Sequence, residues 1–333
     1  RIAQAAAGAA LIPNGMALLR IFVPEHRLGR INGLYNSVIA VAAASGPLVG
    51  AALLEYSSWR LLFLLSVPVV AVALLFHARL RGLEETTADR GPTDWAGVVL
   101  LTAILTGITW LFGSSGGLGT TIVALAVALA AVAFVRRQFI APAPLVPWGL
   151  FRDRSFAAAS AYTIVSNLVL YTSLLTIPFF IREVQDGSVG RIGLLLGAMT
   201  VFMAALAPVS GRLSDAFGRR LPSLAGGVLS LGGASLVFAG IDTDVSFAYL
   251  AVALALVGAG IGLGTGAAST AAVEAAPLTL AGSASGTNSM MRYVGSIVGA
   301  GVLAGLLGSG GPIPDVDVFR AVFAVVAVMA VIT

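Results

Sequence analysis

The segment GRLSDAFGRR, residues 211–220, carries charged side chains at a spacing that could do chemistry. The carboxylate of Asp215 can accept hydrogen bonds from backbone N–H groups at the start of a helix. Arginines flank it on both sides, and glycines permit close approach of a second helix. Such a cluster can hold two elements together in one state and release them in another. The alternative is a charged turn that only fixes topology. The candidate latch consists of Gly211, Arg212, Asp215, Gly218, Arg219 and Arg220.

Polar side chains inside long apolar runs form a second group, which could line a cavity for a small molecule. The candidates are Asn36, Asn167, Tyr171, Asn288 and Arg292. Arg292 stays charged at any relevant pH, so inside a membrane it should face a cavity or pair with a partner. The alternative for each is an interhelical hydrogen bond, worth about 0.6 kcal/mol on average.

Several kinds of chemistry are excluded by composition. The chain has no Cys, which removes disulfides, thiolate nucleophiles and cysteine-based metal centres. All 19 basic residues are Arg, so the lysine of a phosphate-binding loop is missing. The net charge of +4 does not indicate nucleic acid, because membrane proteins concentrate Arg on one side. We therefore expect no enzyme, no cofactor, no metal site and no nucleic-acid partner.

The elements that position these residues are expected to be membrane-spanning helices. The chain is 58% hydrophobic and 10% charged, whereas a soluble domain is about 25% charged. A spanning helix needs about 20 mostly apolar residues, and charges and turn residues divide the chain into eleven such runs. They are residues 3–23, 32–54, 61–78, 96–113, 119–135, 156–181, 191–210, 222–240, 246–272, 284–308 and 318–333.

The arginines give these runs an orientation. Thirteen arginines fall in or beside alternate loops and only four in the opposite loops, which is the bias expected for cytoplasmic loops. We therefore expect a multi-pass protein of the cell inner (plasma) membrane. Shifting the chain by 253 residues also aligns Pro24 with Pro277, Gly33 with Gly286 and Gly46 with Gly299. That coincidence indicates an internal repeat of the kind found in transporters.

The motifs, in this order, resemble the major facilitator superfamily, and specifically its fourteen-helix drug:proton antiporter branch. The segment 211–220 is similar to the superfamily's cytoplasmic loop motif. The other matching residues are Arg1, Gln4, Gly8, Ala9 and Pro13; Gly46, Pro47 and Gly50; Trp59, Arg60, Phe63 and Pro68; and Pro144, Leu145, Phe151, Arg152 and Phe156.

The resemblance implies an all-α integral membrane fold of two six-helix halves plus two linker helices. It aligns the eleven runs with helices four to fourteen, so we expect a fragment truncated at both ends that lacks the first three helices. Residues 1–80 would be the remainder of the N-terminal half, and 81–154 the two linker helices with cytoplasmic loops. Residues 155–333 would form the C-terminal half.

The resemblance also implies roles. Arg1 and Gln4 would take part in proton coupling, and Gly46, Pro47 and Gly50 would seal the outer side of the cavity; an ordinary proline kink is the alternative. None of the 15 acids lies in the middle of a run. The proton-carrying acid would then belong to the absent first helix, which we favour, or Glu274 would serve, or the coupling would differ.

The function implied is proton-coupled efflux of small amphipathic or cationic compounds by alternating access. The partners would be the lipid bilayer, a small-molecule substrate and protons, and we expect a monomer. The alternatives are a secondary transporter of a specific metabolite, working by uptake or export, and a non-transporting membrane scaffold.

Overall fold

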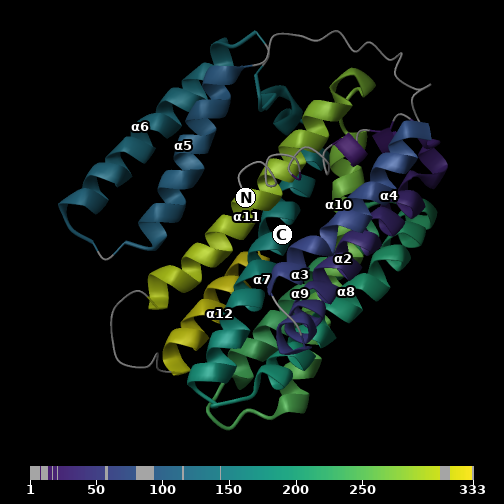
Figure 1. Cartoon of the computed structure of the whole chain (residues 1–333). Helices are drawn as coiled ribbons and strands as arrows, with labels where there is room; N and C mark the ends of the chain where they lie inside the picture. Colours follow the sequence, from purple (N-terminus) through teal and green to yellow (C-terminus); the bar gives the residue numbers. More distant parts are fainter. Residues whose placement is uncertain are drawn as a thin grey trace.

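The computed structural model describes residues 8, 14–16, 18–20, 22–56, 59–79, 94–114, 116–142, 144–307 and 316–331. Within these residues the regular structure is helical, with no strand, so the all-α class is confirmed (Figure 1). The α-helices are α2 (Glu25–Tyr56), α3 (Trp59–Leu64), α4 (Ser66–Arg79), α5 (Trp95–Phe112), α6 (Leu118–Ile140), α7 (Arg154–Glu183), α8 (Val189–Phe217), α9 (Arg220–Gly240), α10 (Phe247–Glu274), α11 (Ala281–Leu307) and α12 (Val316–Val331). Two short 3₁₀ helices, η1 (Trp148–Arg152) and η2 (Leu278–Leu280), precede α7 and α11.

Ten of the eleven apolar runs reappear as helices, and the run 3–23 lies mostly outside the described residues. Helices α6 and α8 end five and seven residues later than their runs. Two further differences concern α2 and the run 61–78. Helix α2 begins seven residues before its predicted run, at Glu25, because the helix continues beyond the apolar stretch through polar residues. The run 61–78 is divided at Leu65, which separates α3 from α4 three residues before Pro68. Proline cannot donate a backbone hydrogen bond, so an interruption one turn before it has a local cause.

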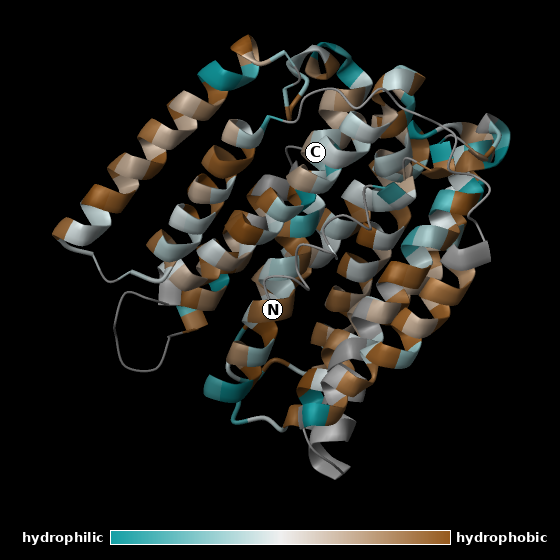
Figure 2. Cartoon of the chain, turned by 45° about the horizontal axis from the view of Figure 1, so that its top comes forward, coloured by the Kyte–Doolittle hydropathy of each residue, from teal (hydrophilic) through white to brown (hydrophobic). Residues whose placement is uncertain are grey.

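Length and composition allow six of the described helices, α5 to α10, to cross a membrane by themselves. Their ends are polar and their middles apolar, and Figure 2 shows the hydrophilic residues gathered at helix ends and connections. Large apolar side chains remain exposed along the outer helices, for example Leu125 and Leu129 on α6, each 62% exposed. Such a surface suits lipid as its surroundings.

Side-chain caps begin α7, α8 and α10. Asp153 accepts hydrogen bonds from the backbone N–H groups of Ser155 and Phe156 at the start of α7. Ser188 and Ser246 cap α8 and α10 in the same way. These caps satisfy N–H groups that the helix itself leaves without a partner. At its other end, α8 stops at Gly218, whose φ of 82° suits glycine.

Helix α10 lies at the centre of the second half, packed against α7, α8 and α9. A Cβ atom at Gly258 or Gly262 would overlap the backbone of α8 at Met199 and Met203. On the adjacent face, Gly260 packs against the backbone of Gly226 in α9. The interleaved glycines therefore let two neighbours approach α10 at backbone distance.

Two further contacts join α2 to α8 and α10, and α11 to α7. Helix α2 packs along α8 and also touches α10. A Cβ atom at Gly211 of α8 would lie 2.9 Å from the Cα of Arg30, so Gly211 permits the close approach that its position predicted. Helix α11 packs on α7, where a Cβ atom at Gly299 would lie 2.7 Å from the carbonyl oxygen of Leu168.

The pair α5 and α6 stands apart from the rest of the bundle and reaches it beside α11 (Figure 1). Its base is a buried polar cluster around Asp94, whose side chain is 2% exposed. The carboxylate accepts hydrogen bonds from the Gly97 backbone N–H (3.0 Å), Arg137 Nε (2.9 Å) and Gln138 Nε2 (3.3 Å). Gln138 Oε1 in turn accepts from the Val146 N–H (3.0 Å), so the cluster also fixes the segment after α6.

Candidate functional site

The carboxylate of Asp215, near the end of α8, binds the beginning of α2. Oδ1 accepts a hydrogen bond from the Gly29 backbone N–H (3.0 Å), and Oδ2 accepts one from the Arg30 N–H (2.8 Å). The start of a helix carries the positive end of its dipole, so a negative charge is stabilised there. The predicted hydrogen bonding of Asp215 to backbone N–H groups is present, and its donors lie in the second turn of α2, which is distant from Asp215 in sequence.

Arg219 extends this contact to α10. Its Nη1 lies 3.0 Å from Asp215 Oδ1, and its Nε and Nη2 bind Glu274 Oε2 (3.0 Å) and Oε1 (2.7 Å). The three side chains are only 17–22% exposed, so water screens them partly. Burial alone would lower the pKa of Arg219, but the hydrogen bonds and charges of Glu274 and Asp215 outweigh it and raise this pKa. We call Asp215, Arg219 and Glu274, with the start of α2, the latch.

The other residues of the predicted latch differ in what they contact. Gly211 and Gly218 have the structural roles described above. The side chains of Arg212 and Arg220 are exposed, and neither forms an ion pair with Asp215 in the part of the chain that the structure describes. The pairing of Arg219 with Glu274 was not predicted. The two residues are 55 positions apart, and only the packing of α8 on α10 brings them together.

A hollow of about 450 Å³ lies beside the latch. His26, Ser214 and Gly218 line it together with the three latch side chains. The latch is therefore accessible to water and protons from one side.

Polar side chains of α2 form a seam with α10. Asn32, fully buried, donates from Nδ2 to the carbonyl oxygen of Gly266 (2.9 Å) and contacts Thr270 Oγ1. Asn36 donates to the backbone oxygen and the side-chain oxygen of Asn32 (2.9 and 2.8 Å). Asn36 therefore holds Asn32, and Asn32 makes the contact from α2 to α10. This arrangement agrees with the alternative stated above, in which Asn36 takes part in helix packing and does not line a cavity.

A second seam joins α7, α10 and α11. Thr163 donates to Asn288 Oδ1 (2.9 Å), and Asn288 Nδ2 reaches Ser269 Oγ at 3.4 Å. Asn167 donates to the carbonyl oxygen of Thr163, within its own helix (2.9 Å). Asn288 therefore connects three helices, whereas Asn167 bonds locally.

Tyr171 on α7 and Arg292 on α11 differ from these amides. Neither side chain takes part in a hydrogen bond or ion pair within the described residues, and the Nε of Arg292 is buried without a partner.

The structure does not test the roles predicted for two further groups of residues. Arg1 and Gln4 lie outside the described residues. Gly46, Pro47 and Gly50 lie within α2, which runs unbroken as a helix from Glu25 to Tyr56. The roles predicted for these five residues stay predictions.

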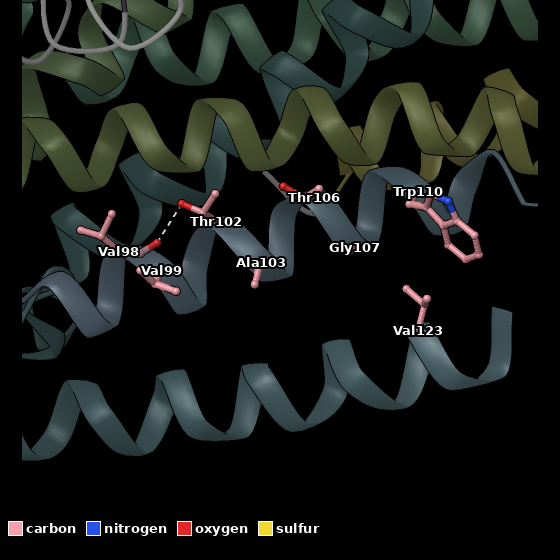
Figure 3. A pocket seen from close by; sticks show the side chains of 8 residues that line it. All are labelled: Val98, Val99, Thr102, Ala103, Thr106, Gly107, Trp110 and Val123. Atoms are coloured by element: carbon pink, nitrogen blue, oxygen red, sulfur yellow. Dashed lines mark hydrogen bonds between the residues drawn. The ribbon is translucent and has the colours of Figure 1, made fainter. Parts of the chain in front are cut away.

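A larger hollow, of about 630 Å³, lies between α5 and α6 (Figure 3). Seven of its eight lining residues come from α5, and Val123 comes from α6. It contains no charged side chain, and the hydroxyl of Thr102 is satisfied by the carbonyl oxygen of Val98 (2.8 Å). The hydroxyl of Thr106 and the indole N–H of Trp110 are its other polar side-chain groups. Because its lining is mostly apolar, the latch and the seams remain the candidate site.

The sequence profile of the Major Facilitator Superfamily matches residues 1–300. The chain belongs to this superfamily. The latch and the polar seams lie where its helices meet.

Comparison with curated proteins gives the same result. The chain is 28% identical over 304 residues to an MFS-type transporter, YvkA, of Bacillus subtilis, covering 91% of this chain and 68% of that protein. It is 29% identical to the tetracenomycin C resistance and export protein of Streptomyces glaucescens, with 95% and 60% covered. It is 28% identical to the methylenomycin A resistance protein of Streptomyces coelicolor, with 93% and 66% covered. The chain thus spans about half to two thirds of the length of such relatives.

Proposed function

We propose that this chain is the greater part of a proton-coupled exporter of small amphipathic compounds that works by alternating access. The superfamily supports transport, and relatives named for antibiotic resistance and export support the outward direction. The fourteen-helix branch and the absence of its first three helices are part of this proposal, supported by the α5–α6 pair between the two groups of helices.

The latch is the observation that carries the mechanism. Alternating access requires a contact between the two halves that forms in one state and breaks in the other. Asp215 and Arg219 join α2 of the first half to α8 and α10 of the second. The arginine bias assigns these helix ends to the cytoplasm, so the structure corresponds to the state that is closed on that side. The latch must break for a substrate to enter from the cytoplasm.

The proposed mechanism also needs a seal on the outer side and residues that couple proton movement to transport. Gly46, Pro47 and Gly50 in α2 would close the outer side when the latch is open, and Arg1 with Gln4 would couple the proton. Glu274 is a less suitable carrier, because both its oxygens bind Arg219 and a proton there would break the latch. We therefore favour a carboxylate outside these residues.

The test uses the full-length protein that contains this chain, in inside-out membrane vesicles. A proton gradient is imposed, a pH-sensitive dye reports it, and lipophilic compounds are added. We expect partial collapse of the gradient on addition. We expect Asp215→Asn to reduce this response by about tenfold or more, since an amide nitrogen cannot accept the bonds that the lost oxygen accepted.

The matched control is Asp244→Asn, because Asp244 lies exposed in the connection between α9 and α10, away from the latch. This variant should behave as wild type. Normal transport by Asp215→Asn would contradict the latch and favour a non-transporting scaffold or another gate. A response to neutral metabolites but to no lipophilic compound would favour the specific-metabolite alternative.

A further inference from the structure

An apolar groove lies between α5 and α6, the pair that stands apart from the bundle (Figure 3). It is the hollow of about 630 Å³ described above, and its lining on α5 extends from Val98 to Trp110. At the rise of an α-helix, these residues span about 18 Å. Val99 and Trp110 are 65% and 50% exposed, so the groove is open to the surroundings of the chain. A long, mostly apolar and open groove suits a hydrocarbon chain.

Two contacts between the helices give the groove its shape. Arg137 Nε binds Asp94 Oδ1 at the base of the pair (2.9 Å). Further along, α5 meets α6 at Gly107, where a Cβ atom would overlap the side chain of Val127. Between these contacts, Ala103 contributes only a methyl group to the lining. Because the helices are held at both places without an occupant, the groove is already formed, which lowers the cost of binding.

Arg137 lies at one end of this groove. It follows Val123, the lining residue of α6, by 14 positions. At about 100° per residue that is four turns less about 40°, so the two residues share a face of α6. On α5, the lining begins at Val98, whose backbone N–H donates to the carbonyl oxygen of Asp94 (3.0 Å). The guanidinium bound to Asp94 is therefore about one helical turn from the apolar lining.

The guanidinium of Arg137 can bind a further acceptor. The side chain is 44% exposed, and within the described residues only its Nε takes part in a hydrogen bond. The Nη groups remain available, and they suit a phosphate, which accepts from a guanidinium at two points. Arginines also outnumber aspartates here, because residues 94–95 and 136–154 contain four arginines and two aspartates. This end of the groove therefore favours an anion.

Aromatic side chains place the same end at the membrane surface. Trp95 begins α5 and is 71% exposed. Phe139, near the end of α6, stacks on Trp148 with ring centroids 6.0 Å apart. Tryptophan is enriched at the level of lipid headgroups. One leaflet contributes about 15 Å of hydrocarbon, half of the bilayer core, so a groove of about 18 Å matches an acyl chain whose headgroup lies at this level.

We propose that the α5–α6 pair binds an anionic phospholipid, with one acyl chain in the groove and the phosphate on the Nη groups of Arg137. The arginine bias assigns this end to the cytoplasmic leaflet. Basic residues between membrane helices on that side are typical of sites for anionic headgroups. The site lies on α5 and α6, whereas the latch and the seams lie on other helices, so it goes beyond the proposed export function.

The experiment counts phospholipids bound to the full-length protein in detergent by native mass spectrometry. The probes are dioleoylphosphatidylglycerol, which is anionic, dioleoylphosphatidylcholine, which has the same chains and no net charge, and glycerol 3-phosphate, which has no chain. We expect the first phosphatidylglycerol to bind about fivefold more tightly than phosphatidylcholine. Glycerol 3-phosphate should not bind at the same concentrations, because it cannot use the groove. No transport takes place, so the outcome is independent of the export assay.

One pair of variants tests the headgroup. Arg137→Gln should weaken phosphatidylglycerol about fivefold, while its amide can still donate to Asp94. The matched control is Arg136→Gln, which removes the same charge one residue away. Arg136 is exposed, and its spacing from Val123 places it on the other side of α6. This control should weaken phosphatidylglycerol by less than twofold.

A second pair tests the groove. Ala103→Phe fills the groove from an exposed position, so the chain should still fold, and both phospholipids should bind about fivefold or more weakly. The control is Ala128→Phe, at an exposed position of α6 on the side away from Val123, which should bind both as wild type does. This pair keeps the test valid if Arg137→Gln does not fold.

Three outcomes would overturn the proposal. Equal affinity of wild type for the two phospholipids would show that the base does not select an anion. Equal losses in Arg137→Gln and Arg136→Gln would show general attraction to a basic surface, with no site at Arg137. Unchanged binding in Ala103→Phe would show that no acyl chain occupies the groove. Each of these outcomes leaves the export function untouched.

Discussion

Two aspartates in this chain, Asp94 and Asp215, each accept hydrogen bonds from backbone N–H groups and from an arginine. Asp215 binds two backbone N–H groups of α2, and Asp94 binds one of α5; each also pairs with an arginine. The chemistry is the same in both places, but only Asp215 bridges the two halves. A carboxylate that binds across a moving boundary can act as a switch, whereas one that binds within a helical pair stabilises that pair.

Asp94 gives a prediction about pH at this scale. The hydrogen bond from the Gly97 backbone N–H lowers the pKa of Asp94 below its ordinary value of 3.8, with Arg137 and Gln138 adding to this against the effect of burial. A lowered pKa means that the carboxylate stabilises the folded chain above its ordinary pKa, and that this stabilisation is lost as pH falls through the folded-state pKa.

We therefore expect wild type to melt at a higher temperature than Asp94→Asn at neutral pH. The difference should persist down to about pH 5 and shrink below that. The measurement is the melting temperature in detergent across this pH range, with Asp244→Asn as the control that should match wild type throughout. A difference that does not change with pH would contradict an ionised Asp94 as the source of the stability.

At the scale of helices, hydropathy predicts which residues can cross a membrane, but it does not predict at which residue each helix begins and ends. The apolar runs predicted nearly every helix, because about 20 apolar residues are needed to cross a bilayer. They did not predict that α2 begins at Glu25, because its first residues project beyond the apolar stretch and are held by Asp215. The division at Leu65 was also missed, since a proline inside an apolar run does not change its hydropathy.

The glycines of α10 give a prediction about packing. Gly258→Ala would place a methyl group in the backbone of Met199, so we expect a loss of about 1–3 kcal/mol in the free energy of unfolding. The control is Gly197→Ala on α8, where a Cβ atom would meet nothing within 4 Å. That variant should be neutral or more stable by up to about 1 kcal/mol, because alanine favours helix. Melting in detergent measures both, and equal stability of the two variants would contradict the tight contact.

At the scale of the whole molecule, the latch joins α2 to α8 and α10, and in the proposed mechanism it closes one side of the transporter. The sequence predicted Asp215 as its centre, because the motif and its side of the membrane are readable from local residues. It did not predict Glu274 or the target helix, because these come from α10 and α2, which are distant in sequence. It also left open whether Asn36 and Asn288 line a cavity. In the closed state both are used in contacts between helices or within them.

This closure gives a prediction about accessibility. The chain contains no cysteine, so Ser269→Cys introduces a single near-isosteric thiol at a buried position of α10. We expect it to react slowly with a membrane-impermeant thiol reagent applied from the cytoplasmic side, and about tenfold faster when combined with Asp215→Asn, which shifts the population to the open state. Thr243→Cys, in the exposed connection after α9, should react at the same rate in both backgrounds when the reagent is applied from its own side. Equal rates at Ser269→Cys in the two backgrounds would contradict a latch that controls this side.

The glycine faces of α10 also limit how such a transporter can evolve. Every missense change of a glycine codon adds at least one carbon atom, and at Gly258, Gly260 and Gly262 that atom would meet a neighbouring helix. We therefore expect substitutions at these three positions to lower stability, so few of them should persist during evolution. We expect adaptation to a new compound to use positions whose side chains are less tightly packed, such as the exposed Tyr171 on α7 and Tyr293 on α11.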